Sequence, residues 1–114
     1  MSKRLLFICS RNRLRSPTAE ALFANVDGLE VDSAGLSPDA EVQLSTEALE
    51  WADVVYVMEK SHLRKLRSRF SAHLSAKRVV CLNIPDKFAY MDPKLIHLLQ
   101  TRVGEASLCR LGPL

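Results

Sequence analysis

The chain of 114 residues has few of the features that mark membrane, secreted or nucleic-acid-binding proteins. None of its apolar runs approaches the roughly 20 residues that span a bilayer, and the run after Lys3-Arg4 is too short for a signal peptide. Its three cysteines are widely spaced and odd in number, which favours reduced thiols over a disulfide framework. The net charge of +3 suits an anionic substrate but does not indicate nucleic acid. We therefore expect a cytoplasmic protein with no membrane or nucleic-acid partner.

What is present is the composition of an ordinary folded domain. The hydrophobic fraction is 47% and the charged fraction 25%, which argues against disordered, collagen-like and coiled-coil chains. The length suits one core, so we predict a single domain over residues 1–114. Cysteine and histidine do not cluster with zinc-ligand spacing, so we expect no metal and no cofactor. We interpret His62, His73 and His97 as surface or helix-end residues.

Strand-like and helix-like segments alternate along the chain. Short apolar runs predict four strands, at residues 4–8, 29–32, 53–58 and 78–84. Helical spacing of apolar residues, with cap signals, predicts four helices, beginning at Pro17, Thr46, Glu59 and Pro93. Such alternation is typical of an α/β fold. We predict a flavodoxin-like three-layer sandwich, a four-stranded parallel sheet of order 2-1-3-4 with helices on both faces.

Local signals refine this pattern. The first helix is predicted to end at a Gly28 cap, with Val26 on its core face. Residues 33–38 are rich in Ser, Gly and Pro and are predicted as a loop. Cys81 lies inside an apolar run and is predicted as a core residue. The helix over 59–70 is basic, and its charges form either a solvated face or a docking patch for acidic partners.

The stretch 9–17 carries the chemistry. An apolar strand leads directly into Cys9, and Ser16 and Pro17 predict a helix N-cap and the first helical residue. Loop amides and a helix dipole between a strand end and a helix start favour an anion and the thiolate form of cysteine. Arg15 offers a planar fork of donors that matches two phosphate oxygens. This combination predicts attack by sulfur on a phosphate ester.

The same stretch resembles the signature of the low-molecular-weight protein tyrosine phosphatases. That signature has Cys, five residues, then Arg-Ser, usually Pro, and an Ala-Glu-Ala helix. The matching residues here are Cys9, Asn12, Arg15-Ser16-Pro17, Ala19-Glu20-Ala21, and later Ser33-Ala34-Gly35 and Pro85-Asp86-Lys87-Phe88. The chain resembles a short form of the family, because the stretch after Gly35 is reduced. The resemblance implies a cysteine-dependent phosphatase that hydrolyses phosphomonoesters, protein phosphotyrosine among them, through a phosphocysteine intermediate.

The resemblance also implies roles. Cys9 is the nucleophile, and Arg15 with the loop amides holds the equatorial phosphate oxygens. Ser16 donates to the sulfur, and Asn12 braces the loop and tolerates left-handed backbone. The phosphate-binding set is Ser10, Arg11, Asn12, Arg13, Leu14, Arg15 and Ser16. The expected ligands are a phosphorylated protein or small phosphomonoester, and inorganic phosphate or another oxyanion in the loop.

Two carboxylates compete for the role of general acid. Asp86 follows the fourth strand within the matching Pro-Asp-Lys-Phe segment, and we predict that it protonates the leaving oxygen and then activates water. Asp92 precedes Pro93 and is explained as the N-cap of the last helix. A carboxylate that already accepts backbone hydrogen bonds is a poor proton donor.

Departures from the family pattern keep alternatives open. Arg11 stands where the family usually has glycine, and Leu14 where many members have a second cysteine. The aromatic substrate wall and a His-x-Ala-Arg segment have no counterpart. One alternative is a catalytically weak or silent phosphate- or phosphoprotein-binding module. Another is a thiol-linked arsenate reductase, which needs a cysteine relay that Cys81 and Cys109 are poorly placed to supply. A third is that Cys9 is only a buried structural thiol.

Overall fold

The computed structural model describes residues 3–74 and 77–111, with side chains as far as Gly104. Its elements are β1 (Lys3–Cys9), α1 (Arg15–Phe23), β2 (Leu29–Gly35), α2 (Thr46–Trp51), β3 (Val54–Val57), α3 (Lys60–Phe70), the 3-10 turn η1 (Ser71–His73), β4 (Arg78–Cys81) and α4 (Pro93–Leu111). The strands form one parallel sheet in the order β2-β1-β3-β4, which confirms the predicted order 2-1-3-4.

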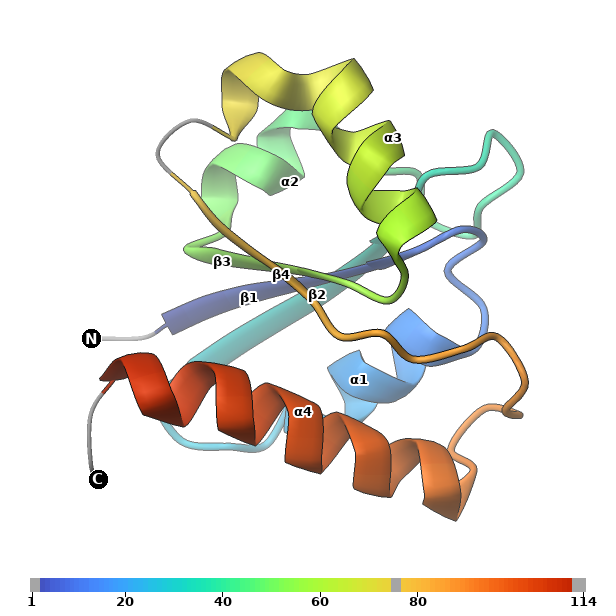
Figure 1. Cartoon of the computed structure of the whole chain (residues 1–114), viewed down its shortest axis with the longest axis vertical. Coiled ribbons are helices and arrows are strands. Elements are labelled where there is room, and N and C mark those ends of the chain that lie inside the picture. Colours follow the sequence, from blue (N-terminus) through green and yellow to red (C-terminus); the bar gives the residue numbers. More distant parts are fainter. Residues whose placement is uncertain (1–2, 75–76, 112–114) are drawn as a thin grey trace.

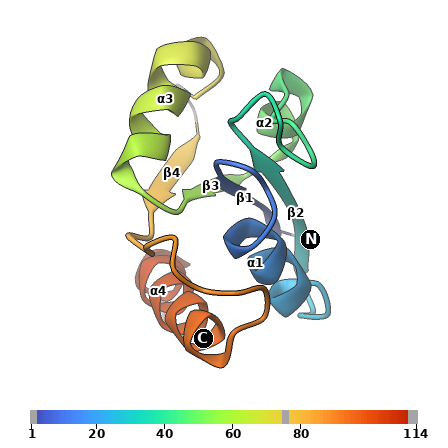
Figure 2. The same ribbon diagram turned by 90° about the vertical axis from the view of Figure 1, so that its right-hand side faces the viewer.

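Helices cover both faces of this sheet. Helices α1 and α4 pack on one face and α2 and α3 on the other (Figure 1, Figure 2). Strand β1 is central, and its side chains alternate between two buried clusters: Leu5, Phe7 and Cys9 face α1 and α4, whereas Leu6 and Ile8 face α2 and α3. A strand covered on both faces needs this continuous apolar run. The predicted three-layer sandwich is therefore confirmed.

The later helices follow the predicted pattern. Ser45 caps α2 through its hydroxyl, which accepts from the Ala48 amide, and Asp92 Oδ1 accepts from the Lys94 amide at the start of α4. Buried side chains recur at helical spacing in α3 and α4, namely Leu66, Leu95, Leu99 and Val103. The helical spacing of the sequence also predicts Ala106 on the core face of α4, and its side chain lies outside the described part of the chain. Within the described residues, no helix has the length and apolar character that a membrane crossing requires.

The first helix differs from the prediction at both ends. It begins at Arg15, two residues before Pro17, the predicted first helical residue, and its N-cap residue Leu14 makes no side-chain cap bond. It ends at Phe23, and Val26 is 45% exposed instead of packed in the core. Gly28 has a φ of +85°, but it serves the turn before β2 and not the helix end.

The strands also differ in length from the prediction. Residues 33–35 form the end of β2 instead of a loop, because they pair in register with residues 7–9 of β1. Tertiary pairing of this kind overrides local turn propensity. Strand β4 stops at Cys81, three residues early, and Asn83 has a left-handed φ of 55° that interrupts the extended backbone.

Gly35 marks the closest approach of β2 to the loop after β1. A Cβ atom there would lie 2.6 Å from the Ser10 carbonyl oxygen, 2.6 Å from the Ala40 Cβ and 3.0 Å from the Asn12 amide nitrogen. The two contacts of 2.6 Å are shorter than real Cβ contacts, and one of them is to the backbone oxygen of Ser10, so the loop itself would have to move. The loop after β1 therefore packs directly on Gly35, which has no side chain.

We predict that Gly35→Ala lowers the free energy of unfolding by about 1–3 kcal/mol, the usual cost of overpacking. Gly104→Ala is the matched control, because a Cβ at Gly104 meets nothing within 4 Å. That variant should gain roughly 0.5–1 kcal/mol from the higher helix propensity of alanine. Urea unfolding of both variants measures the difference, and equal stability of Gly35→Ala and the parent would show that the close packing is not required.

Candidate active site

The loop after β1 and the segment after β4 meet at the carboxyl ends of the strands (Figure 2). They enclose a pocket of about 560 Å³. Its lining residues are Cys9, Ser10, Arg11, Arg13, Leu14, Arg15 and Asp86. Asn12 and Ser16 are buried and do not line the pocket. The chain thus gathers the predicted site residues at one edge of the sheet, seven as lining and two inside the protein beside the loop.

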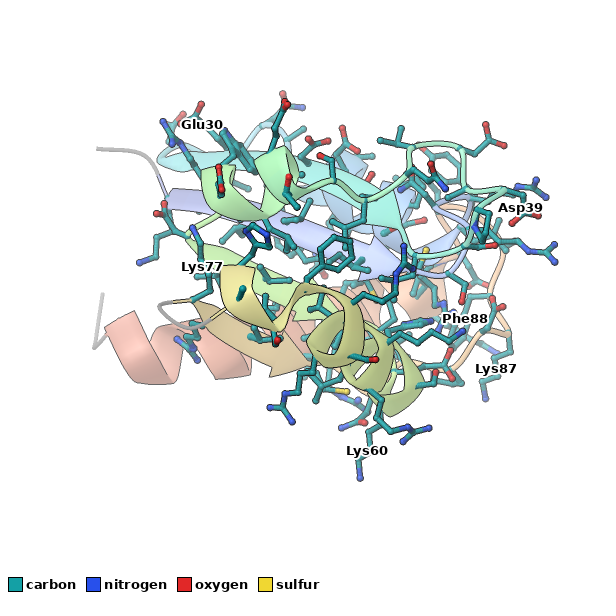
Figure 3. All side chains as sticks on the ribbon, turned by 90° about the horizontal axis from the view of Figure 1, so that it is seen from above. Glu30, Asp39, Lys60, Lys77, Lys87 and Phe88 are labelled. Atoms are coloured by element: carbon teal, nitrogen blue, oxygen red, sulfur yellow. The ribbon has the colours of Figure 1, made fainter. Side chains whose placement is uncertain are left out.

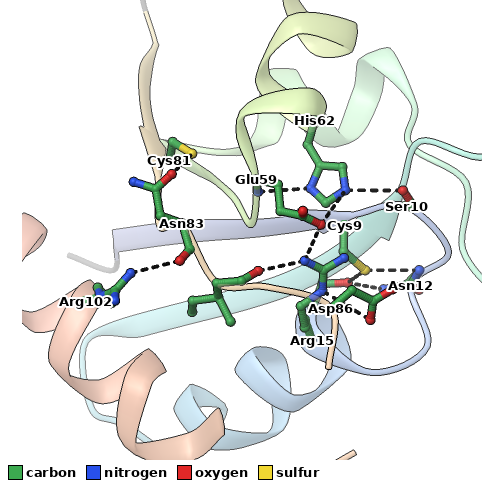
Figure 4. Close-up of polar contacts among 12 residues, drawn as sticks. Cys9, Ser10, Asn12, Arg15, Glu59, His62, Cys81, Asn83, Asp86 and Arg102 are labelled. Carbon is green, nitrogen blue, oxygen red and sulfur yellow. Dashed lines mark hydrogen bonds and ion pairs between the residues drawn. The ribbon is translucent and has the colours of Figure 1, made fainter. Parts of the chain in front are cut away.

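The sulfur of Cys9 lies within a set of hydrogen-bond donors (Figure 4). The Asn12 amide donates to it at 3.2 Å, and the Ser16 hydroxyl lies 2.9 Å away. Asn12 Nδ2 in turn donates to Ser16 Oγ at 3.0 Å. Because Ser16 Oγ accepts from Asn12, its own proton is available for the sulfur. Ser16 therefore contacts the thiol and is not the helix cap that the sequence predicted.

Asn12 holds the loop in two ways. Its backbone has a left-handed φ of 57°, and its Nδ2 also donates to Ser33 Oγ at 2.9 Å. The Ser33 hydroxyl then donates to Glu20 of α1. Ser33 was not predicted as part of the site, and its place in the matching Ser-Ala-Gly segment was the only signal for it.

The loop backbone forms a cradle for an anion. The carbonyl groups of Cys9, Ser10 and Arg11 accept hydrogen bonds from three amides of segment 36–41. In a trans peptide the N–H of the next residue points the opposite way from the carbonyl oxygen. The amides of residues 10–12 are therefore directed away from segment 36–41, and that of Asn12 reaches the Cys9 sulfur.

Arg11 is accommodated in this loop without backbone strain. The left-handed residue is Asn12, and Arg11 has no positive φ. Arg11 and Arg13 pair with Asp39 at 3.8 Å and Glu41 at 3.3 Å, and all four side chains are about half exposed or more. Exposed pairs of this kind contribute little stability, but they offset the positive charge at the rim.

The guanidinium of Arg15 is buried, with only 4% of the side chain exposed. Its Nη1 donates to Glu59 Oε2 at 2.6 Å and to the Ile84 carbonyl at 2.7 Å. These bonds use both protons of Nη1 and leave Nε and Nη2 as the edge for an anion. Glu59 was missed because it lies 44 residues away, at the N-cap of α3.

The two candidate acids are separated by the structure. Asp86 lines the pocket, and its Oδ1 lies 3.7 Å from Arg15 Nε. Asp92 accepts the Lys94 amide at the start of α4 and does not line the pocket. Only Asp86 is therefore placed beside the sulfur-bearing loop.

Comparison with known proteins gives consistent findings. The family model described as low molecular weight phosphotyrosine protein phosphatase matches residues 4–50. The YwlE arginine phosphatase from Geobacillus stearothermophilus is 26% identical, with a TM-score of 0.73 over 91% of this chain and 92% of that chain. SP-PTP, a low molecular weight protein tyrosine phosphatase from Streptococcus pyogenes, is 18% identical, with a TM-score of 0.75 over 96% and 93%. The tyrosine phosphatase Wzb from Escherichia coli K30, in complex with phosphate, is 20% identical, with a TM-score of 0.71 over 98% and 100%. No curated protein matches the chain.

The matched segment contains the complete loop from Cys9 to Ser16, and the likeness in fold extends over nearly the whole chain. Residues 4–50 thus match the low-molecular-weight phosphotyrosine protein phosphatase family, and the fold of nearly the whole chain is similar to that of solved structures of such phosphatases. The family that this model describes consists of protein phosphatases, which are hydrolases.

Of the two positions that the sequence interpretation gave for His62, the helix end is right and the surface is wrong. It is the third residue of α3 but is only 2% exposed, and its ring contacts Ser10 and Glu59. Its spacing of four from the buried Leu66 was the signal that could have placed it inward. His97 is exposed and His73 is half-buried beside Glu50.

Cys81 is half-buried and not a full core residue, and its thiol donates to Asn83 Oδ1 at 3.4 Å. It packs against the cluster under α2 and α3, whereas Cys9 belongs to the cluster under α1 and α4. The two thiols therefore lie on opposite faces of the sheet, and both are free. The side chain of Cys109 lies outside the described residues.

Burial, reinforced by the positive charge of Arg15, lowers the pKa of His62 from 6.5 to about 4. The unfolded chain therefore binds a proton near pH 6.5, whereas the folded chain binds it only near pH 4. The contribution of the neutral His62 ring to the free energy of unfolding is therefore fully present above pH 6.5. It is lost as the pH falls towards 4. At about 1.4 kcal/mol per pH unit, the loss reaches about 3 kcal/mol.

Between pH 6.5 and pH 4, we predict that the free energy of unfolding falls more in the parent than in His62→Asn, which lacks the titrating ring. The difference should be about 3 kcal/mol. The exposed His97→Asn is the control and should follow the parent. Urea titrations at pH 4.5, 5.5 and 6.5 measure the effect. Parallel curves for the parent and His62→Asn would contradict the prediction.

Proposed function

We propose that the chain is a cysteine-dependent phosphatase that hydrolyses phosphomonoesters, with protein phosphotyrosine as its substrate class. The observation that carries the proposal is the Cys9 sulfur, which lies in a loop of amides between the Ser16 hydroxyl and the Asn12 amide. Arg15 beside it has two nitrogens left for an anion. Free thiols and a thiolate mechanism suit a reducing compartment such as the cytoplasm.

The proposed chemistry has two steps. The Cys9 thiolate attacks phosphorus in line, forming the S–P bond as the ester P–O bond breaks, and Asp86 gives its proton to the leaving oxygen. Water then attacks the phosphocysteine while Asp86 takes its proton, and the sulfur leaves as thiolate. Arg15 Nε and Nη2, with the loop amides, stabilise the three equatorial oxygens in both steps.

The rim of the pocket bears on the substrate. Leu14 lines the pocket and is 38% exposed, which offers an apolar contact to an aromatic ring. The similar YwlE protein is an arginine phosphatase, so phosphoarginine is the competing substrate class. A cysteine relay for arsenate reduction is disfavoured by the opposite placement of Cys9 and Cys81.

We predict that the parent releases phosphate from an aryl phosphate and from a phosphotyrosine peptide, and more slowly from a phosphoarginine peptide. Cys9→Ser should lower turnover at least about 10³-fold, as loss of a nucleophile does, and retain phosphate binding by the amide cradle. Arsenate with a thiol donor is tested in parallel. No phosphate release from any substrate, with phosphate still bound, would favour the silent binding module.

The general acid is tested by the leaving-group dependence of the rate. Asp86→Asn should slow hydrolysis of phenyl phosphate by ~10²–10⁴-fold and affect an ester with an activated leaving group much less. Asp92→Asn is the matched control and should behave like the parent, because asparagine is also a good N-cap. The assignment is wrong if Asp92→Asn shows the leaving-group dependence and Asp86→Asn does not.

A second groove, of about 470 Å³, is lined in part by Pro85, the chain neighbour of the pocket residue Asp86. Glu59 and Ile84, which both accept hydrogen bonds from Arg15, also line this groove. The basic residues in its lining are Lys60 and Arg64. Lys60 extends outward from the first turn of α3 (Figure 3). Within the described part of the chain, neither cation has an acidic partner. We propose that this groove receives acidic residues flanking the phosphorylated side chain.

We predict that Arg64→Ala lowers the ratio of kcat/KM for an acidic phosphopeptide to kcat/KM for an aryl phosphate by about 3- to 10-fold at low salt. Arg67→Ala makes the same charge change one turn along α3, outside the groove, and should leave the ratio unchanged. Equal effects of the two variants would indicate a general attraction by the basic helix instead of a groove.

A further inference from the structure

Only one tautomer of the neutral His62 ring satisfies the hydrogen bonds of both ring nitrogens. Nδ1 accepts the Glu59 backbone amide at 3.2 Å, so Nδ1 carries no proton. In the neutral ring the proton is then on Nε2, which lies 3.2 Å from Ser10 Oγ. The Glu59 carboxylate is 3.9 Å from Nε2, beyond hydrogen-bond distance. His62 therefore donates to Ser10.

This direction determines what the Ser10 hydroxyl can do. Its oxygen accepts from His62, so its own proton must be donated elsewhere. Ser10 lines the pocket next to Cys9, and among the described residues its Oγ has no hydrogen-bond partner other than His62. Among the described residues this proton therefore has no acceptor, and the pocket that Ser10 lines is open to one.

We propose that His62 is a positioning residue that fixes the Ser10 hydroxyl as a hydrogen-bond donor to the phosphoryl oxygens held in the loop. The inference rests on the proposed phosphatase function and adds a side-chain donor to the backbone cradle. The same turn of α3 positions Arg15, because the Glu59 side chain accepts the His62 amide as a capping box and Glu59 Oε2 also binds the guanidinium. One helix cap thus orients two side chains of the loop.

The arrangement persists over the range in which a phosphatase works. The charged groups that act on the ring are Arg15, Glu59, Lys65 and Asp86. Burial and the cations outweigh the carboxylates, and the pKa of about 4 keeps His62 neutral from pH 5 to 8. The Nε2–H proton is therefore present throughout this range.

Two substitutions separate the two contacts of the ring. His62→Asn places an oxygen near the Nδ1 position and keeps the acceptor for the Glu59 amide, but it does not reach Ser10. His62→Gln places an amide nitrogen near Nε2 and keeps the donor to Ser10. We expect His62→Asn to weaken inorganic phosphate binding by about 2- to 10-fold, the usual effect of one hydrogen bond, and His62→Gln to restore most of it.

Ser10→Ala should weaken phosphate binding to the same extent, and the double variant Ser10→Ala/His62→Asn should be no weaker than Ser10→Ala alone. Additive losses, or a His62→Asn protein that binds phosphate like the parent, would overturn the proposal. Phosphate binding is measured by calorimetry and does not require turnover, so a failure of the proposed phosphatase activity is distinguished from a failure of this inference.

The unmodified protein supplies an independent test. Long-range ¹H–¹⁵N NMR spectra distinguish a ring protonated at Nε2 from one protonated at Nδ1. We expect the Nε2–H form of His62 at pH 6 to 8, and a shift of the Ser10 hydroxyl or its neighbouring amides when phosphate is added. The Nδ1–H form would reverse the donor direction and overturn the proposal, whatever the activity of the variants.

Discussion

The buried guanidinium of Arg15 is the group on which the geometry of the site depends. A charge with 4% exposure is costly unless it is paired and fully hydrogen-bonded. Glu59 and the Ile84 carbonyl supply this pairing from positions 44 and 69 residues away. The contact therefore connects the start of α1, the start of α3 and the segment after β4. The loop that leads into α1 and the segment after β4 line the pocket, and the start of α3 holds the Arg15 guanidinium beside it.

The first turn of α3 has a structural and a chemical role at the same time. Its capping box joins Glu59 and His62 reciprocally, which is a common way to begin a helix. In this protein the side chains of the box also reach Arg15 and Ser10. The stability of the helix start and the geometry of the loop are therefore coupled. A substitution in this turn is expected to affect both unfolding and anion binding.

The electrostatics of the pocket come mainly from fixed dipoles. Arg11 and Arg13 at the rim each have an acidic partner, and Arg15 is matched by Glu59. What remains for an anion is the set of loop amides, the helix start and one edge of the guanidinium. Preorganised donors of this kind do not have to rearrange when charge develops on a transferring phosphoryl group.

Part of this arrangement can be predicted from local sequence patterns. Alternating apolar runs and cap signals were enough for the sheet order and the helix starts at Thr46 and Pro93, because adjacent elements in such folds follow simple packing and handedness rules. The spacing from Cys9 to Arg15 and the choice of Asp86 over Asp92 also rested on neighbouring residues.

The rest was decided only by tertiary structure. Ser33 became a strand residue through pairing with β1, and Gly35 is needed because the loop after β1 packs against it. Glu59 and His62 reach the loop only because parallel crossovers bring the start of α3 to the same edge of the sheet as the end of β1. The amino-acid sequence by itself predicted Cys9 as the nucleophile, and it determined the fold that presents the loop of Cys9. The partners that orient Arg15 and Ser10 come from more than 40 residues away, and local periodicity carries no information on contacts at that separation.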